Sequence, residues 1–166
     1  MGSVATYSFN SGAVVPTNRM RYIDIFNDVG SGKIIKVHLI KGYTKPSLAH
    51  AANCVYLTIL KTSTVATGGT TLSAVQFDST DPALPSQITS RGSPTAGGTS
   101  LYNLGGFNLG LDDNLFVAPC IAYNNRGGKQ PRQIILREGE GLMMQQINFS
   151  TGSVGVGVVE VEFGVI

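Results

Sequence analysis

The sequence contains few charged residues: Asp, Glu, Lys and Arg make up 13% of its 166 residues, whereas about 25% is usual. A free monomer normally covers its surface with charged side chains, so this deficit favours a chain that hides surface against other subunits. The alternative is a sandwich domain whose surface is simply polar and uncharged. With 12 basic and 10 acidic residues, the net charge of +2 is too balanced for binding that depends on neutralising phosphates. We therefore expect no direct nucleic-acid partner.

The sequence also lacks membrane and export signals. It has no stretch of about 20 apolar residues. Its N-terminal Met-Gly-Ser-Val-Ala-Thr-Tyr lacks the basic and apolar regions of a signal peptide. We expect no membrane partner, and we expect the protein to be made and kept in a cytoplasm or released from it by lysis.

Residues for metal or covalent chemistry are scarce. The two histidines are His38, which alternates with core residues on the solvated face of its strand, and His50; a cupin-type metal centre therefore lacks ligands. Cys54, four residues after His50, is the nearest candidate for a thiol paired with a base. It lies in an apolar run, as Cys120 does, and burial argues against a reactive thiolate. Both cysteines are expected to be small buried hydrophobic groups, with a disulfide as the alternative. We predict no enzyme activity, no metal and no cofactor.

Paired carboxylates have a local explanation, because each pair lies where the chain is expected to turn. A calcium site near Asp112 is the minor alternative, since the twelve-residue calcium loop pattern is absent. The pairs are Asp78 with Asp81, Asp112 with Asp113, and Glu138 with Glu140.

What the sequence does contain is a series of β-type runs. Segments rich in β-branched and aromatic residues alternate with Gly-rich turns, and no helical spacing is sustained beyond a possible two-turn helix at 47–52. With the weaker runs included, we expect about eight or nine strands. The clearest runs are 20–27, 34–41, 54–60, 71–77, 115–123, 142–149 and 154–165.

This spacing predicts an all-β fold, an antiparallel β-sandwich that is jelly-roll-like. We assign 1–18 to an N-terminal arm and 19–166 to a single sandwich domain. Two Gly-rich segments, 27–33 and 67–70, have the composition of hairpin connections. The Pro-, Gly- and Ser-rich stretch 78–110 is expected to be a long loop that carries binding.

One segment concentrates positive charge. The loop at 124–132 contains Arg126, Lys129 and Arg132 and is expected to protrude between two strands. These three cations are candidates for gripping acidic surface on a partner subunit, the alternative being a merely solvated connection. The loop lacks interleaved aromatics, so it is a poor platform for single-stranded nucleic acid.

Two turn motifs resemble those of small bacteriophage virion proteins. The first is Tyr-Ile-Asp-Ile-Phe-Asn-Asp-Val-Gly-Ser-Gly-Lys-Ile-Ile-Lys-Val-His-Leu-Ile, which starts at Tyr22. The second is Ile-Ile-Leu-Arg-Glu-Gly-Glu-Gly-Leu, which starts at Ile134 and is followed by a Val-Glu-Val-Glu-Phe ending. In the second motif, Glu138 stands where such proteins often have proline. The likeness covers about a third of the chain.

The resemblance implies a capsid decoration or cement protein that binds the major capsid protein and stabilises the head. Such a protein has a jelly-roll fold, forms a homo-oligomer (a trimer or a dimer) and is located in the virion after synthesis in the host bacterial cytoplasm. For capsid contact we favour the N-terminal arm, at 2–18, and the basic loop with Arg126, Lys129 and Arg132.

The rival hypothesis is a receptor- or carbohydrate-binding head on a tail fibre or spike, with 78–110 as the ligand face. Sugar sites usually offer a stacking aromatic. The chain has no Trp, and the aromatics in or beside these loops are Tyr102, Phe107 and Tyr123, which makes this reading the weaker one.

Overall fold

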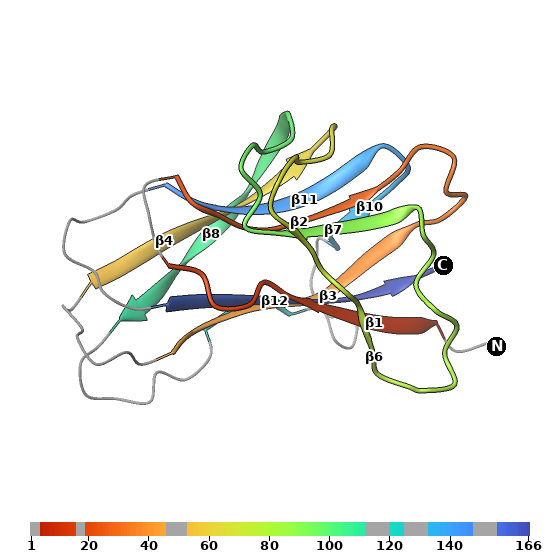
Figure 1. The fold of residues 1–166 in the computed structure, drawn as a ribbon, viewed down its shortest axis with the longest axis horizontal. Coiled ribbons are helices and arrows are strands. Elements are labelled where there is room, and N and C mark those ends of the chain that lie inside the picture. The colour runs from red at the N-terminus through yellow and green to blue at the C-terminus, as the bar shows by residue number, and fades with distance from the viewer. Residues whose placement is uncertain (1–3, 16–18, 46–52, 112–119, 125–132, 148–155) are drawn as a thin grey trace.

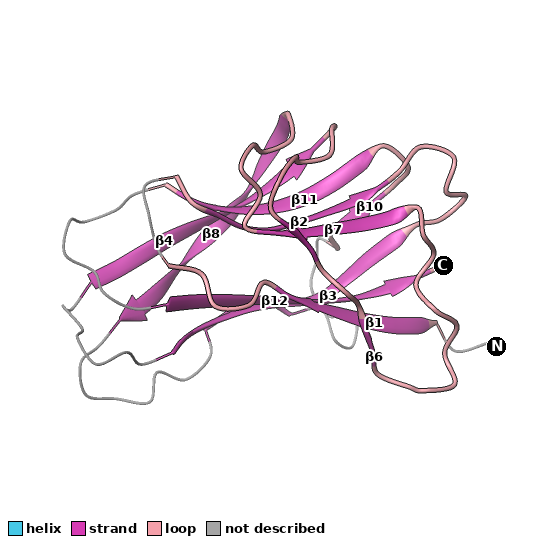
Figure 2. Cartoon of the chain, viewed as in Figure 1, coloured by secondary structure: helices cyan, strands magenta, loops and turns pink. Residues whose placement is uncertain are grey.

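The computed structural model describes 4–15, 19–45, 53–111, 120–124, 133–147 and 156–166, and within these ranges it contains strands and no helix (Figure 2). The described residues form twelve strands, of which β5, β6 and β10 have two residues each. The first six are β1 (Ala5–Asn10), β2 (Arg21–Asn27), β3 (Ile35–Lys45), β4 (Asn53–Thr62), β5 (Thr70–Thr71) and β6 (Val75–Gln76). The others are β7 (Ile88–Gly92), β8 (Ser100–Leu111), β9 (Cys120–Asn124), β10 (Ile135–Leu136), β11 (Glu140–Gln146) and β12 (Val156–Val165).

The strands form two antiparallel sheets that pack face to face (Figure 1). Sheet A has the order β10-β3-β12-β1-β6, with β9 also paired to β3, and sheet B has the order β5-β7-β2-β11-β4-β8. The predicted all-β antiparallel sandwich is therefore confirmed. The finer expectation of a jelly roll stays a prediction.

The core lies between the sheets and is built from alternate residues of the long strands. Sheet A contributes Tyr7, Phe9 and Phe163. The Phe163 ring stacks on Tyr7, with centroids 5.8 Å apart, and on Phe9, with centroids 5.3 Å apart. Sheet B contributes Ile23 and Met144, which face each other across β2 and β11. Because residues on opposite faces of a strand alternate, this burial fixes which side chains point outward.

The N-terminal segment is part of the sandwich rather than a separate arm. Strand β1 lies between β12 and β6 in sheet A, and Tyr7 and Phe9 are each only 1% exposed. Two large aromatic side chains of an arm outside the core would remain in water, which the hydrophobic effect disfavours. We therefore place Ala5–Asn10 in the domain, whereas the sequence had suggested an arm over 1–18.

The two expected hairpins are connections of a different kind. The turn at 27–33 joins β2 in sheet B to β3 in sheet A, and the segment 67–70 leads to β5, which pairs with β7 and not with β4. The turn chemistry itself was predicted correctly, since Gly30 and Gly32 have φ of 84° and 64°. Turn residues fix local dihedral angles but not the sheet that the next strand joins.

Strand β8 and the middle of β3 also differ from expectation. Ser100–Leu111 is a twelve-residue strand paired with β4, although its glycines and asparagines had indicated a loop. In β3, a bulge opposite Glu162 and Phe163 shifts the register. Ile40, which strict alternation from His38 would place on the solvated face, therefore lies in the core at 0% exposure. A one-residue slip of this kind exchanges the two faces of a strand.

Some expectations fall outside the described residues, namely the helix at 47–52, His50, Asp112 with Asp113, and the start of the strand at 115–123. The described residues include no helix of the length and hydropathy that a membrane span requires.

Candidate interaction surfaces

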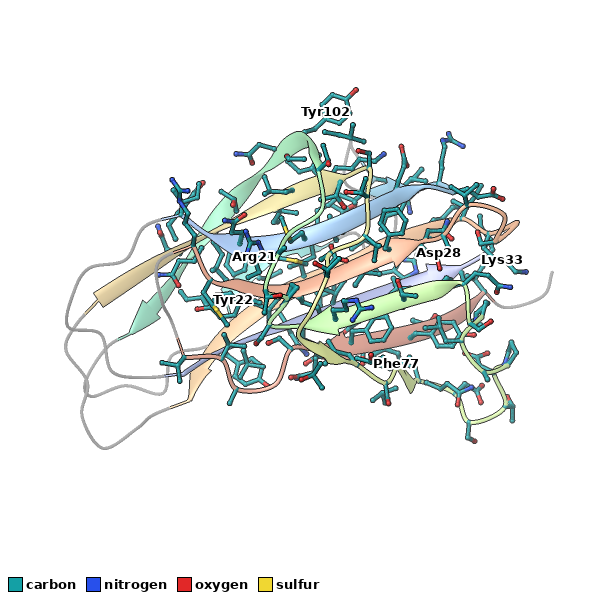
Figure 3. All side chains as sticks on the ribbon, turned by 45° about the horizontal axis from the view of Figure 1, so that its top comes forward. Arg21, Tyr22, Asp28, Lys33, Phe77 and Tyr102 are labelled. Atoms are coloured by element: carbon teal, nitrogen blue, oxygen red, sulfur yellow. The ribbon has the colours of Figure 1, made fainter. Side chains whose placement is uncertain are left out.

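The two turn motifs that resemble phage virion proteins meet at one end of the sandwich. The Glu138 carboxylate accepts hydrogen bonds from the backbone N–H groups of Gly30, at 3.0 Å, and Gly32, at 2.7 Å. The Gly139 N–H donates to the Asn27 carbonyl at 2.8 Å. Asp28 and Lys33, which are labelled in Figure 3, lie at this end of the sandwich. Residues about a hundred positions apart in the chain thus hold the two sheets together at the same corner.

Replacing Glu138 with glutamine or alanine is expected to lower the free energy of unfolding by about 1 kcal/mol, because two backbone donors lose a charged acceptor at a solvent-exposed site. Urea unfolding of both variants measures the loss. Val29→Ser, a change in the same turn at a residue that is 81% exposed, serves as the control. Stability equal to wild type in both Glu138 variants would contradict a stabilising role.

The other carboxylates mostly form turns as predicted. Asp78 Oδ1 accepts hydrogen bonds from the Thr80 backbone N–H and hydroxyl, which lower the pKa of Asp78. Glu140 pairs with Lys61 at 2.8 Å. Among the described residues, no group of three or more His, Cys, Asp or Glu is placed to hold a metal ion.

The basic loop lies outside the described residues, so the structure does not place Arg126, Lys129 or Arg132. Its flanks are described: the chain enters the loop from β9 and continues into β10, and both strands pair with β3. The prediction that this loop joins two strands is therefore confirmed. Its partner-binding role stays a prediction.

An apolar patch, which we call the sheet A patch, covers the outward face of sheet A near its β6 edge. It consists of Val4, Val75, Phe77 and Ile166, which are 45%, 63%, 56% and 43% exposed. Val75 lies opposite Ser8 on β1, and the Phe77 N–H donates to the Thr6 carbonyl. Val4 extends over Gly164 of β12. The patch therefore continues across three adjacent strands.

Farther along the same face, ionic groups are paired with one another. Lys41 Nζ lies 3.0 Å from Glu160 and 3.9 Å from Glu162. These pairs bridge β3 and β12, and the single lysine faces two glutamates, so one negative charge is in excess. The sheet A patch itself contains no charged side chain, although Asp78 directly follows Phe77 in the chain.

A second apolar feature, which we call the β8 ridge, consists of Leu101, Tyr102 and Leu104 on the edge of sheet B. Register shifts leave Leu101 and Leu104 without an opposing residue on β4. Such bulges redirect side chains. The three side chains are 43%, 65% and 42% exposed, and Figure 3 shows Tyr102 pointing away from the ribbon on the side opposite Phe77.

A shallow hollow of about 440 Å³ lies beside the ridge. Its lining is rich in amides, and Phe107, a candidate for stacking on a sugar, is buried at 6% exposure. Much of 78–110, the expected ligand face, is strand and not loop. The carbohydrate-binding hypothesis stays a prediction without support from this hollow. The lining residues are Arg19, Thr58, Leu60, Asn103, Gln145, Gln146 and Ile147.

Sheet B carries a buried acid on the face that points away from the core. Asp24 is 0% exposed, and its Oδ2 accepts a hydrogen bond from the Ala66 N–H at 3.3 Å. Its Oδ1 has no hydrogen-bond partner. Burial raises the pKa of Asp24 to about 6, although the Ala66 N–H and the Arg91 guanidinium act in the opposite direction. Since Ile23 and Ile25 are buried on the other face, this strand is covered on both sides.

No family of known proteins, no curated protein and no solved structure matches the chain. Its function therefore has to be inferred from its own surfaces. Neither apolar surface was predicted from the sequence. Two features of the sequence could have indicated these surfaces. One is the alternation of Val75 with Phe77, and the other is the leucines within the glycine-rich segment 101–109.

Proposed function

We propose that this chain is a structural protein of a bacteriophage particle, a capsid decoration or cement protein that binds the major capsid protein and stabilises the head. The observation that carries the proposal is the sheet A patch, an exposed apolar surface on a domain with few charged residues. Exposed apolar patches on small domains mark protein interaction sites. The protein would be made in the bacterial cytoplasm and function in the virion.

The patch suits the mechanics of a decoration protein. Burial of Phe77 and Val75 against a neighbour would contribute about 1.5–3 kcal/mol for each side chain, which makes a modest contact for one subunit. A closed shell presents many identical sites, so an oligomer that engages several of them binds through avidity. Weak individual contacts can thus give a stable coat.

The contact between the two turn motifs supports the same proposal. Gly30 and Gly32 belong to one motif and Glu138 to the other, and the hydrogen bonds between them make a single structural unit. Glu138 stands where the resembling proteins often have proline, and here it supplies the acceptor that joins the motifs. Arg126, Lys129 and Arg132 remain our proposal for a second, electrostatic contact with the capsid.

The proposal predicts that the double variant Val75→Ser, Phe77→Ser binds capsids at least about tenfold more weakly than wild type, because apolar burial at the contact is lost. Co-sedimentation with heads that lack the protein gives the number of bound copies. Heat or osmotic rupture of those heads reports stabilisation.

Val29→Ser, at a residue that is 81% exposed but lies in the turn between the sheets, should bind like wild type. If wild-type protein saturates no sites on the heads, the decoration function is wrong. If it saturates them and the double variant does so equally well, the function stands but the sheet A patch is not the contact.

A further inference from the structure

We infer that the β8 ridge is a contact between two copies of this chain, packed about a two-fold axis. This contact is separate from the capsid surface proposed above and does not depend on it. The ridge lies on β8, the last strand of sheet B in the described part of the chain. The sheet A patch lies across β6, β1 and β12 of the other sheet, so one molecule can use both surfaces at once.

The ridge has the exposure and shape of a protein contact. Leu101 and Leu104 are the two bulged residues of β8, and Tyr102 between them is the most exposed of the three at 65%. Tyrosine is enriched where contacts between proteins are strongest. Three large side chains held outward by two bulges cost free energy in water, which a partner surface would recover.

The absence of charge favours a second copy as the partner. No charged residue occurs anywhere in 92–111, although proteins usually protect an exposed edge strand with lysine or another charge. A different protein is commonly selected through complementary charges, and this segment offers none. Two copies of an uncharged strand can approach each other without repulsion.

The order of the side chains fits a two-fold axis. If two β8 strands lie antiparallel with the axis between Tyr102 and Asn103, Leu101 of each copy faces Leu104 of the other. Every apolar contact then occurs twice, as in an isologous interface. The Gly105 N–H already donates to Asn103 Oδ1 at 2.9 Å, so this N–H is not available for a backbone hydrogen bond to the second copy.

An interface of this size lies at the small end for protein pairs, below about 1,200 Å² in total. We therefore expect association in the micromolar range for free protein. Sedimentation analysis from about 1 to about 200 µM covers that range and should show wild-type protein shifting from monomer to dimer.

Two charged variants test the site and its symmetry. One carries Leu101→Lys and Leu104→Lys, and the other carries Leu101→Asp and Leu104→Asp. Each variant alone should stay monomeric, because like charges face each other across the axis. An equimolar mixture at low salt should form a heterodimer, because each lysine then faces an aspartate. Thermal unfolding of each variant confirms that it folds.

The control is Val75→Lys, a charge at a residue of similar exposure on the sheet A patch, which should dimerise like wild type. The inference is overturned by a wild-type protein that stays monomeric, by a charged variant that still dimerises alone, or by a mixture that does not associate. Capsid binding is measured separately. Loss of capsid binding in the ridge variants, with a monomeric wild type, would assign the ridge to the capsid instead.

Discussion

Phe163→Ala is expected to lower the free energy of unfolding by about 4 kcal/mol, the largest effect of any substitution considered for this protein. Phe163 is 0% exposed and stacks on both Phe9 and Tyr7 at the centre of sheet A. The truncation removes apolar burial and leaves a cavity that two rigid rings cannot fill. Since domains of this size are stable by about 5–15 kcal/mol, the variant should be only marginally folded at 25 °C.

Urea unfolding and thermal unfolding both measure this loss. The melting temperature should fall by about 10 °C. Phe77→Ala is the matched control, because the same atoms are removed from a ring that is 56% exposed, and its stability should change by less than about 1 kcal/mol. A Phe163→Ala variant as stable as the control would show that the aromatic stack does not hold the sheets together.

Asp24→Asn is expected to stabilise the protein at neutral pH, by up to about 3 kcal/mol. Burial raises the pKa of Asp24 from 3.8 to about 6, and a shift of this size in a buried group corresponds to that free energy. Asparagine keeps the shape of the side chain and can still accept the hydrogen bond from the Ala66 N–H. It also places an uncharged amide where the unpartnered Oδ1 lies.

The direction of the pH dependence follows from the raised pKa. In the folded protein Asp24 holds its proton more tightly than in the unfolded chain. Its favourable contribution is therefore fully present below about pH 4 and is lost as the pH rises through about 6. Glu140, whose pKa is lowered by Lys61 and the Arg137 N–H against an opposing burial effect, changes stability in the opposite direction. The difference between wild type and Asp24→Asn isolates Asp24.

Unfolding free energies measured at intervals from pH 4 to pH 8 check this expectation. The two proteins should converge near pH 4, and the variant should be increasingly more stable toward pH 7.5. Val29→Ser, which changes no titratable group and lies at a residue that is 81% exposed, should run parallel to wild type. A variant that is less stable than wild type at pH 7.5 would mean that the charged carboxylate is satisfied by Arg91.

The described structure places its candidate contacts on two different sheets. Ion pairs lie farther along the face that carries the sheet A patch, whereas the β8 ridge belongs to a segment without charged residues. A copy bound to a shell through the first surface leaves the second available for a neighbouring copy. In the proposed arrangement, each copy would bind the shell through the sheet A patch and a neighbouring copy through the β8 ridge.

The sequence predicted the features that depend on local physical chemistry. Alternating apolar residues, as in Val159 to Val165, can be buried only on one face of a strand, so they indicated an antiparallel sandwich. Glycines at positions such as Gly30 and Gly32 were expected to turn the chain, and their positive φ values confirm it. The scarcity of charge indicated a surface that contacts other protein, which stays a prediction.

The tertiary structure alone decided which elements become neighbours. Whether the chain after 27–33 returns to the same sheet or crosses to the other depends on long-range burial, so two expected hairpins were wrong. Strand β8 was missed because its glycines disfavour a strand locally, whereas pairing with ten residues of β4 stabilises it. The burial of Asp24, the meeting of Glu138 with Gly30, and the bulges that expose Leu101 and Leu104 all arise from contacts between distant segments, which local sequence patterns do not encode.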